Sequence, residues 1–223
     1  MKKTVLITGA SSGIGWSLTQ KFLNENYIVI GGSRSGKIEG IANTDLYVVP
    51  LDVTDEKSIF EAGKSIRAQF SSIDLLINNA GVGLDLATFK PEMELLKATF
   101  ETNVFGLIHF TESILDLIPA KGTIFTISSV MGMLNRESLL ANATAYRMSK
   151  AAVNMYTKTL AARLADQNIN VNAIHPGWVK TNMGGEGAAI TPEFSANGIF
   201  QLYEKNIPTA TFWDAEHQTQ MNW

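Results

Sequence analysis

Tyr146 and Lys150 are the residues of this chain whose types and spacing most directly suggest chemistry. They are four positions apart, a spacing that puts both side chains on one face of a helix. A free phenol titrates at about 10, too high for proton transfer at neutral pH, and a neighbouring ammonium favours the phenolate and lowers that value. The pair therefore predicts a tyrosine general acid beside a lysine, with an exposed helical pair as the alternative.

A glycine-rich turn follows the apolar run Val5–Ile7. The segment Thr8–Gly15 reads Thr-Gly-Ala-Ser-Ser-Gly-Ile-Gly and precedes an amphipathic helical pattern. Glycine permits a tight turn and a close approach of the backbone to a phosphate, and a helix N-terminus offers free N–H groups to a pyrophosphate. Between a strand and a helix, this pattern predicts a dinucleotide-binding turn, with a plain connecting loop as the alternative. The residues expected to form it are Gly9, Ser11, Ser12, Gly13, Ile14 and Gly15.

Short apolar runs alternate with helical patterns along the chain. Most runs are rich in Val, Ile and Leu without strict alternation, which is typical of strands covered on both faces. The runs are Val5–Thr8, Tyr27–Ile30, Leu46–Val49, Leu75–Asn78, Thr123–Ile127 and Val171–Ile174, with Phe212–Trp213 as a seventh candidate. They predict an α/β fold, a Rossmann-type doubly wound parallel sheet of about seven strands with helices on both faces in three α/β/α layers. Ligands of such sheets bind at the carboxyl ends of the strands, where both motifs fall.

Composition limits the class of protein. The 223 residues fit one domain, 1–223, and the net charge of −3 gives no basic surface for nucleic acid. The absence of cysteine excludes disulfides, thiolate catalysis and zinc–sulfur sites and fits a reducing compartment. The three histidines are scattered, so we expect no metal. No stretch approaches the roughly 20 apolar residues that span a bilayer, and Thr4–Ile7 is too short for the core of a secretory signal. We therefore expect a cytoplasmic protein with no membrane partner.

Six motifs occur in a fixed order along the chain. They are Thr8-Gly-x-x-x-Gly-Ile-Gly15, Asn78-Asn79-Ala80-Gly81, Asn103, Ser129, Tyr146-x-x-x-Lys150 and Pro176-Gly177. In these motifs the chain resembles the short-chain dehydrogenase/reductase family over almost its whole length. A narrower resemblance to the carbonyl reductases of the sniffer and C-factor type is carried by Tyr146–Ala152 and His175–Thr181.

The resemblance implies further contacts with a nicotinamide dinucleotide, including one between Lys150 and the nicotinamide ribose. Asp52 matches an acid that contacts adenine, but it could also be a turn or helix-capping residue. Asn79 matches the loop under the adenosine ribose, but it could also bridge strands through its side chain. The implied cofactor positions beyond the glycine-rich turn are Asp52, Val53, Asn79, Ala80, Gly81, Tyr146, Lys150, Pro176, Gly177, Val179 and Thr181.

The end of the second strand indicates which cofactor is bound. An acid at this point would bond the ribose hydroxyls of NAD and repel a phosphate. Here Ser33 stands at that position and Arg34 follows. A guanidinium binds a 2′-phosphate through charge-assisted hydrogen bonds. We therefore predict NADP(H) over NAD(H), with a solvated Arg34 as the alternative and Lys37 as a surface residue.

Two more residues complete the expected catalytic group. Ser129 can donate a hydrogen bond to a carbonyl oxygen as charge develops on it, and alignment to the family's Ser-Ser-x-x-Gly selects it over Ser128. Asn103 matches an asparagine that opens a helix locally and anchors a water that relays protons to the lysine, with a buried structural amide as the alternative. The expected catalytic residues are Asn103, Ser129, Tyr146 and Lys150.

The substrate site should lie beyond the nicotinamide. Candidate walls are Val130–Leu140, Trp178 and the loop Met183–Phe194, and they are mostly apolar. Such a pocket suits aldehydes, ketones or quinone-like carbonyls. Because Met183–Ala189 contains three glycines, we expect a mobile substrate loop near 183–197. The resemblance also implies a homodimer or homotetramer.

Together these features predict an NADPH-dependent oxidoreductase that reduces a small-molecule carbonyl. A cofactor-binding sensor or signalling protein on the same fold is the main alternative, since fold does not fix function. A dehydratase or epimerase is weaker, because the short chain has no added domain for a sugar nucleotide.

Overall fold

Eight strands form one sheet in the order β3-β2-β1-β4-β5-β6-β7-β8. The structure is a computed structural model that describes residues 2–135 and 140–223. Strands β1 to β7 pair in parallel, and β8 pairs antiparallel with β7. The strands are β1 Thr4–Thr8, β2 Ile28–Ser33, β3 Leu46–Pro50, β4 Leu75–Asn78, β5 Thr123–Ile127, β6 Asn170–His175, β7 Phe212–Asp214 and β8 Thr219–Met221.

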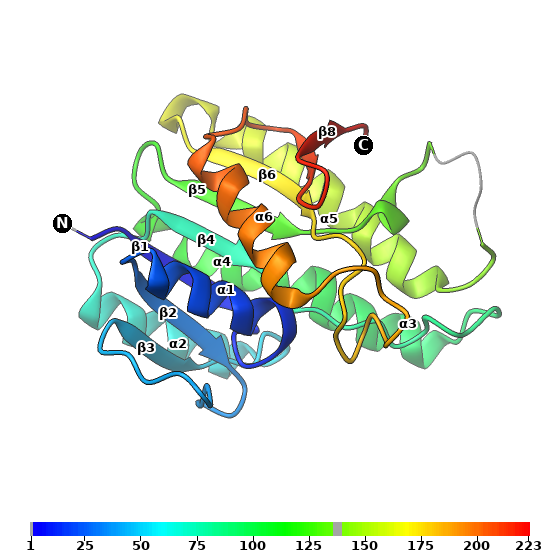
Figure 1. Ribbon diagram of the computed structural model, residues 1–223, viewed down its shortest axis with the longest axis horizontal. Helices are drawn as coiled ribbons and strands as arrows, with labels where there is room; N and C mark the ends of the chain where they lie inside the picture. Colours follow the sequence, from blue (N-terminus) through cyan, green and yellow to red (C-terminus); the bar gives the residue numbers. More distant parts are fainter. Residues whose placement is uncertain (1, 136–139) are drawn as a thin grey trace.

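Helices cover both faces of the sheet, as the doubly wound pattern predicts (Figure 1). Helices α1 and α6 lie on one face, and α2, α4 and α5 lie on the other. The α-helices are α1 Gly13–Asn24, α2 Glu56–Gln69, α3 Met93–Phe100, α4 Leu107–Ile114, α5 Thr144–Arg163 and α6 Pro192–Glu204. A π-helical turn, Glu101–Gly106, joins α3 to α4, and short 3-10 turns lie at Leu115–Leu117, Val130–Gly132 and Ala165–Gln167.

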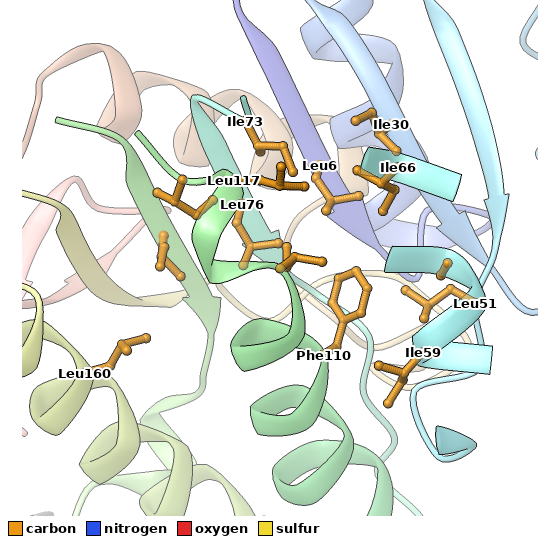
Figure 2. Close-up of a cluster of buried hydrophobic side chains, with 14 of the residues drawn as sticks. Leu6, Ile30, Leu51, Ile59, Ile66, Ile73, Leu76, Phe110, Leu117 and Leu160 are labelled. Atoms are coloured by element: carbon orange, nitrogen blue, oxygen red, sulfur yellow. The ribbon is translucent and has the colours of Figure 1, made fainter. Parts of the chain in front are cut away.

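Two hydrophobic clusters, one on each face, explain the uninterrupted apolar runs. Figure 2 shows the cluster on the α2, α4 and α5 face, in which Leu6, Ile30 and Leu76 of the strands lie beside Ile59 and Phe110 of the helices. Successive residues of a strand point to opposite faces of the sheet. Because both faces are covered by helices, each strand has apolar side chains on both faces. Burial on both faces therefore explains why the strands are continuous apolar runs in the sequence.

The second cluster holds α1 and α6 against the sheet. Leu18 and Phe22 of α1 and Ile199 of α6 are fully buried there, together with Val5 and Ile77 of the strands. Leu18 and Phe22, which recur at helical spacing in the sequence, thus both face the core. This packing fixes the start of α1 at the carboxyl end of β1.

Strand β8 is the main element that the sequence patterns missed. Its residues, Thr219-Gln220-Met221, form no apolar run because the strand lies at the sheet edge and its first two residues are exposed. The sheet therefore has eight strands instead of about seven. Helix α6 begins at Pro192 and so takes in the last part of the segment 183–197 that was predicted as a loop. The mobility of that segment stays a prediction.

Candidate active site

The turn between β1 and α1 requires glycine at several of its positions. Gly9 and Gly13 have φ values of +66° and +53°, in the left-handed region that favours glycine. A Cβ on Gly15 would lie 2.1 Å from the carbonyl oxygen of Gly9. The turn can therefore bring its backbone close to a bound group, which is what a dinucleotide pyrophosphate requires.

The first turn of α1 is open to an anion. Ser12 is its N-cap, and within the described part of the chain its hydroxyl accepts no capping hydrogen bond. Ser11 and Ser12 are exposed, whereas Ile14 packs against the core cluster on the α1 face. The free N–H groups of this helix start fit a pyrophosphate. These residues suit a dinucleotide, and their contacts with it stay predictions.

Asn79 ties the end of β4 to the end of β1. The backbone N–H groups of Asn79 and Ala80 each donate to Thr8 Oγ1 over 3.0 Å. Asn79 Nδ2 donates to the carbonyl oxygens of Thr8, at 3.0 Å, and Gly9, at 3.2 Å. Asn79 thus bridges the two strands, which is the alternative role that the sequence left open for it. Its direct contact with a cofactor, and that of Ala80, stay predictions.

The end of β2 presents a positive charge at the rim of the site. Ser33 is buried and donates a hydrogen bond from Oγ to the carbonyl oxygen of Lys37 over 2.9 Å. The next residue, Arg34, is exposed. Hydrogen bonds from the backbone and hydroxyl of Thr54 lower the pKa of Asp52, and the nearby charge of Arg34 adds to this effect. Arg34 therefore lies on the same rim as Asp52.

Asp52 forms a local turn rather than a helix cap. Its Oδ1 accepts from Thr54 N at 2.9 Å and Thr54 Oγ1 at 2.7 Å. The cap of α2 is Asp55, which accepts from the backbone N–H groups at the start of that helix. Val53 is buried in the hydrophobic cluster on this face. The turn alternative for Asp52 is therefore observed, and its contact with adenine stays a prediction.

Tyr146 and Lys150 lie one turn apart on α5, and both are buried. Lys150 Nζ is 5.5 Å from the centroid of the Tyr146 ring. It donates a hydrogen bond to the carbonyl oxygen of Ile127, at the end of β5, over 2.8 Å. The pair therefore faces the sheet at the carboxyl end of a central strand, and the alternative of an exposed helical pair is excluded.

Ser129, and not Ser128, faces the tyrosine. A hydrogen bond with Ser129 acts on the Tyr146 phenol and lowers its pKa. Ser128 is turned away, because its Oγ donates to Asn154 Oδ1 over 2.5 Å in a buried pair. The geometry thus selects the same serine as the alignment of motifs.

Burial dominates the electrostatics of Tyr146 and Lys150. It raises the pKa of Tyr146 to about 12, against the smaller lowering effect of Ser129, and it lowers the pKa of Lys150 to about 8. The net shift of the Tyr146 pKa is therefore upward, opposite to the lowering expected from the nearby Lys150, because spacing in sequence does not reveal the depth of burial. Tyr146 therefore keeps its proton at neutral pH.

Asn103 lies in the π-helical turn, where the helix opens locally. Its Oδ1 accepts from Val82 N at 2.7 Å, and its Nδ2 donates to Val82 O at 2.8 Å and Ser149 Oγ at 3.0 Å. A Cβ on Gly81 would lie 3.3 Å from Asn103 Oδ1 and 3.8 Å from Lys150 Nζ, so only glycine leaves this space open. Asn103 thus has a structural role in this network, and its proposed part in a proton relay stays a prediction.

Ser149 is a site residue that the sequence reasoning missed. It is fully buried, accepts the hydrogen bond from Asn103, and donates from Oγ to the carbonyl oxygen of Tyr146 over 2.7 Å. It therefore connects the π-helical turn to the turn of α5 that carries the phenol. Ser149 lies between Tyr146 and Lys150 in the same motif, and this position could have marked it as a site residue.

The loop after β6 returns to the glycine-rich turn. Gly177 has φ of +87°, and Pro176 accepts a buried hydrogen bond from Ser195 at its carbonyl oxygen. Val179 is buried and forms a bridge with Ile190. A Cβ on Gly13 would lie 3.1 Å from Thr181 Cγ2, so Thr181 lies directly beside the turn. The predicted cofactor residues from both halves of the sheet therefore meet at its carboxyl edge.

The predicted substrate walls present apolar side chains to solvent. Leu134, Trp178 and Phe194 are all exposed, and Trp178 Nε1 donates to the carbonyl oxygen of Gly184 over 2.9 Å. Residues 136–139 of the predicted wall Val130–Leu140 lie outside the described residues.

Within residues 2–135 and 140–223, no three or more His, Cys, Asp or Glu side chains lie close enough together to hold a metal ion. In the same residues, no helix is long and apolar enough to cross a membrane.

Several known proteins are similar to this chain in sequence and in fold. A family model described as short chain dehydrogenase matches residues 3–189. The short-chain dehydrogenase anuI of Penicillium roqueforti is 30% identical, over 95% of this chain and 92% of its own. The NADPH-bound carbonyl reductase from chicken fatty liver has a TM-score of 0.89 at 30% identity, covering 100% of this chain and 94% of its own. The carbonyl reductase Sniffer of D. melanogaster has a TM-score of 0.88 at 25% identity, with both chains covered completely.

The family model spans the glycine-rich turn, the asparagine of the π-helical turn, the serine at the end of β5 and the tyrosine–lysine pair of α5. The solved relatives share the fold of this chain over its whole length. The chain therefore belongs to the short-chain dehydrogenase family of oxidoreductases.

Proposed function

We propose that this protein is an NADPH-dependent reductase that converts an aldehyde, ketone or quinone-like carbonyl to the alcohol. The observation that carries the proposal is the buried group of Ser129, Tyr146 and Lys150 at the carboxyl end of β5. It shares the edge of the sheet with the open N-terminus of α1. A phenol that keeps its proton at neutral pH suits reduction, since the product oxygen must gain a proton.

Each residue of the group has a separate task. A nicotinamide cofactor, when held at the glycine-rich turn, would supply the hydride for the carbonyl carbon. As charge develops on the carbonyl oxygen, Ser129 donates a hydrogen bond to it, and Tyr146 transfers its proton to it. Lys150, held by the carbonyl oxygen of Ile127, provides a positive charge beside the phenol that stabilises the phenolate left behind.

The predicted walls of the substrate site support this substrate class. They include exposed Leu134 and Trp178, which are apolar or aromatic. The carbonyl reductases among the structural relatives support the same class.

The test is a titration of the purified protein with NADPH and with NADH, followed by nicotinamide fluorescence, and then a panel of aldehydes, ketones and quinones. Tight NADPH binding with turnover supports the proposal. Binding without turnover on any of these carbonyls favours the sensor alternative. Failure to bind either cofactor would contradict the dinucleotide site itself.

Cofactor preference gives a sharper prediction at the end of β2. Arg34→Glu replaces a phosphate-binding cation with a repelling anion, so we expect kcat/KM with NADPH to fall by about 100-fold, the sum of a lost charge-assisted hydrogen bond and a new repulsion. The value with NADH should change little. Steady-state kinetics with both cofactors measures the ratio. Lys37→Glu, an equal change of charge in the same exposed loop, is the control and should keep the preference. An Arg34→Glu protein that still prefers NADPH would sink the assignment.

A further inference from the structure

The helix that carries the catalytic tyrosine has no cap of its own. Ser, Thr, Asp and Asn in extended backbone usually occupy the N-cap position, but the N-cap of α5 is Ala143, in left-handed conformation with φ of +60°. Alanine offers no side-chain acceptor. The N–H groups in the first turn of α5, including that of Tyr146 itself, must therefore be bonded from elsewhere.

Asp85 bonds them from a distant segment of the chain. Its Oδ2 accepts from Ala145 N at 2.6 Å, and its Oδ1 accepts from Tyr146 N at 3.1 Å. These are the second and third positions of the helix, the ones that an N-cap side chain normally serves. Asp85 is only 3% exposed, and among the described residues no basic side chain pairs with it. A buried carboxylate is thus held by the start of the catalytic helix, where the helix dipole favours it.

The segment that carries Asp85 is also the one that reaches the predicted cofactor. It leaves β4 through Ala80 and Gly81, exchanges two hydrogen bonds with Asn103 at Val82, and reaches Asp85 three residues later. Asp85 therefore joins the helix of the proton donor to the loop beneath the cofactor position.

We propose that Asp85 is a positioning residue for Tyr146, which fixes the first turn of α5 relative to the cofactor loop so that the phenol lies beside Ser129. The inference rests on the proposed function, because positioning matters only if Tyr146 donates a proton. Asp85 touches none of the reacting atoms and acts through the backbone of Tyr146.

Neighbouring contacts hold the approach to α5 in the same way. Asn142 Nδ2 donates to Leu86 O at 2.7 Å, and Ala143 N donates to Thr88 O at 3.0 Å. These bonds fix the chain just before the helix, whereas the N–H group of the tyrosine is bonded by Asp85 and by no other described residue. A variant of Asp85 therefore loosens the tyrosine turn while the approach stays attached.

Helix α2 offers a matched control. Asp55 caps it with the same pattern, accepting from Lys57 N at 3.2 Å and Ser58 N at 3.3 Å. Asp55 is exposed and takes no part in the catalytic group. Asp55→Ala thus measures the general effect of losing a helix cap. Asp85→Ala measures the effect of losing the cap on the helix that carries Tyr146.

The kinetic experiment compares Asp85→Ala, Asp85→Asn and Asp55→Ala at a temperature where melting curves show all of them folded. We expect kcat of Asp85→Ala to fall by 10- to 100-fold, the order that a small misplacement produces, with KM for NADPH within about twofold of the wild type. Asp85→Asn keeps one acceptor oxygen at the same place and should recover kcat to within about fivefold. Asp55→Ala should keep kcat within about twofold. A kcat for Asp85→Ala within twofold of wild type, or an equal loss in Asp55→Ala, would overturn the proposal.

Amide hydrogen exchange provides a readout that does not depend on turnover. In Asp85→Asn, which loses one of the two acceptor oxygens, exchange at Ala145 or Tyr146 should become faster while exchange at Val153, deeper in α5, stays unchanged. Should Asp85→Ala fail to fold, Asp85→Asn carries both measurements. A wild-type protein that reduces no carbonyl contradicts the proposed function, and exchange alone then decides whether Asp85 holds this turn. Unchanged exchange at both amides would refute the role of Asp85 on its own.

Discussion

Tyr146→Phe is expected to reduce kcat by about 1,000-fold while NADPH still binds. General acid catalysis contributes about 100- to 10,000-fold to rates, and the substitution removes the only atom of this side chain that can give a proton. The phenyl ring fills the same buried space on α5. Ser129 keeps a second hydrogen bond, because its Oγ also accepts from Met131 N at 3.1 Å. The free energy of unfolding should therefore change by less than about 1.5 kcal/mol, as for other volume-conserving changes.

The measurement combines carbonyl reduction kinetics with a fluorescence titration of NADPH. Tyr156→Phe is the matched control, since Tyr156 lies on the same helix and donates from its hydroxyl to Glu112 Oε1 over 2.8 Å, away from the catalytic group. It should keep full turnover. Near-native turnover in Tyr146→Phe would remove Tyr146 from the role of proton donor.

Lys150→Met is expected to abolish turnover and to stabilise the fold at neutral pH. Lys150 is 6% exposed, and burial lowers its pKa from 10.5 to about 8. Such a shift corresponds to about 3 kcal/mol of unfavourable burial of the charged form. Methionine keeps the apolar stem and removes the charge, but it leaves the Ile127 carbonyl oxygen without this donor, which offsets about 1 kcal/mol. We expect a net stabilisation of about 2 kcal/mol at pH 7.

The pH dependence of stability follows from the same pKa. Below about pH 8 the lysine is charged in both the folded and unfolded chains, and the full penalty of burial is present. Between about 8 and 10.5 the folded chain releases its proton first, so it binds fewer protons than the unfolded chain and its stability rises with pH. The advantage of Lys150→Met should therefore shrink over this range.

Urea denaturation at pH 7 and pH 9.5 measures both effects. Lys158→Met, an exposed change on the same helix, should have little effect on stability at either pH. A Lys150→Met protein that is less stable than wild type at pH 7 would show that the buried ammonium stabilises the fold.

The strands and the glycine-rich turn could be predicted because their causes are local. Runs such as Leu75–Asn78 and Thr123–Ile127 match β4 and β5 residue for residue, since both faces of these strands are buried. The glycines of the turn are fixed by their own backbone conformation and by the lack of space at Gly15. The edge strand β8 lacks such a cause, because its residues face solvent and carry no apolar pattern.

The contacts that position the catalytic residues could not be predicted, because they join distant segments. Asp85 looks like any loop aspartate in the sequence, and only the fold brings it to Ala145, 60 residues later. The pKa of Tyr146 was misjudged for a related reason: the spacing of Tyr146 and Lys150 places an ammonium nearby, but burial is set by the whole fold. Motifs thus indicated which residues are candidates for catalysis, and tertiary packing determines their protonation and position.

The segment after β4 also bears on the order in which the chain folds. It bonds Thr8 across 71 residues at Asn79, Asn103 across 21 at Val82, and the start of α5 across 60 at Asp85. Each of these contacts joins segments that are far apart in sequence, so forming it has the entropic cost of closing a loop. Such loop closure slows folding. We therefore expect this edge of the sheet to be assembled late, after the local helices have formed. A partly folded chain with most of its secondary structure in place would still be unable to bring its proton donor to a substrate.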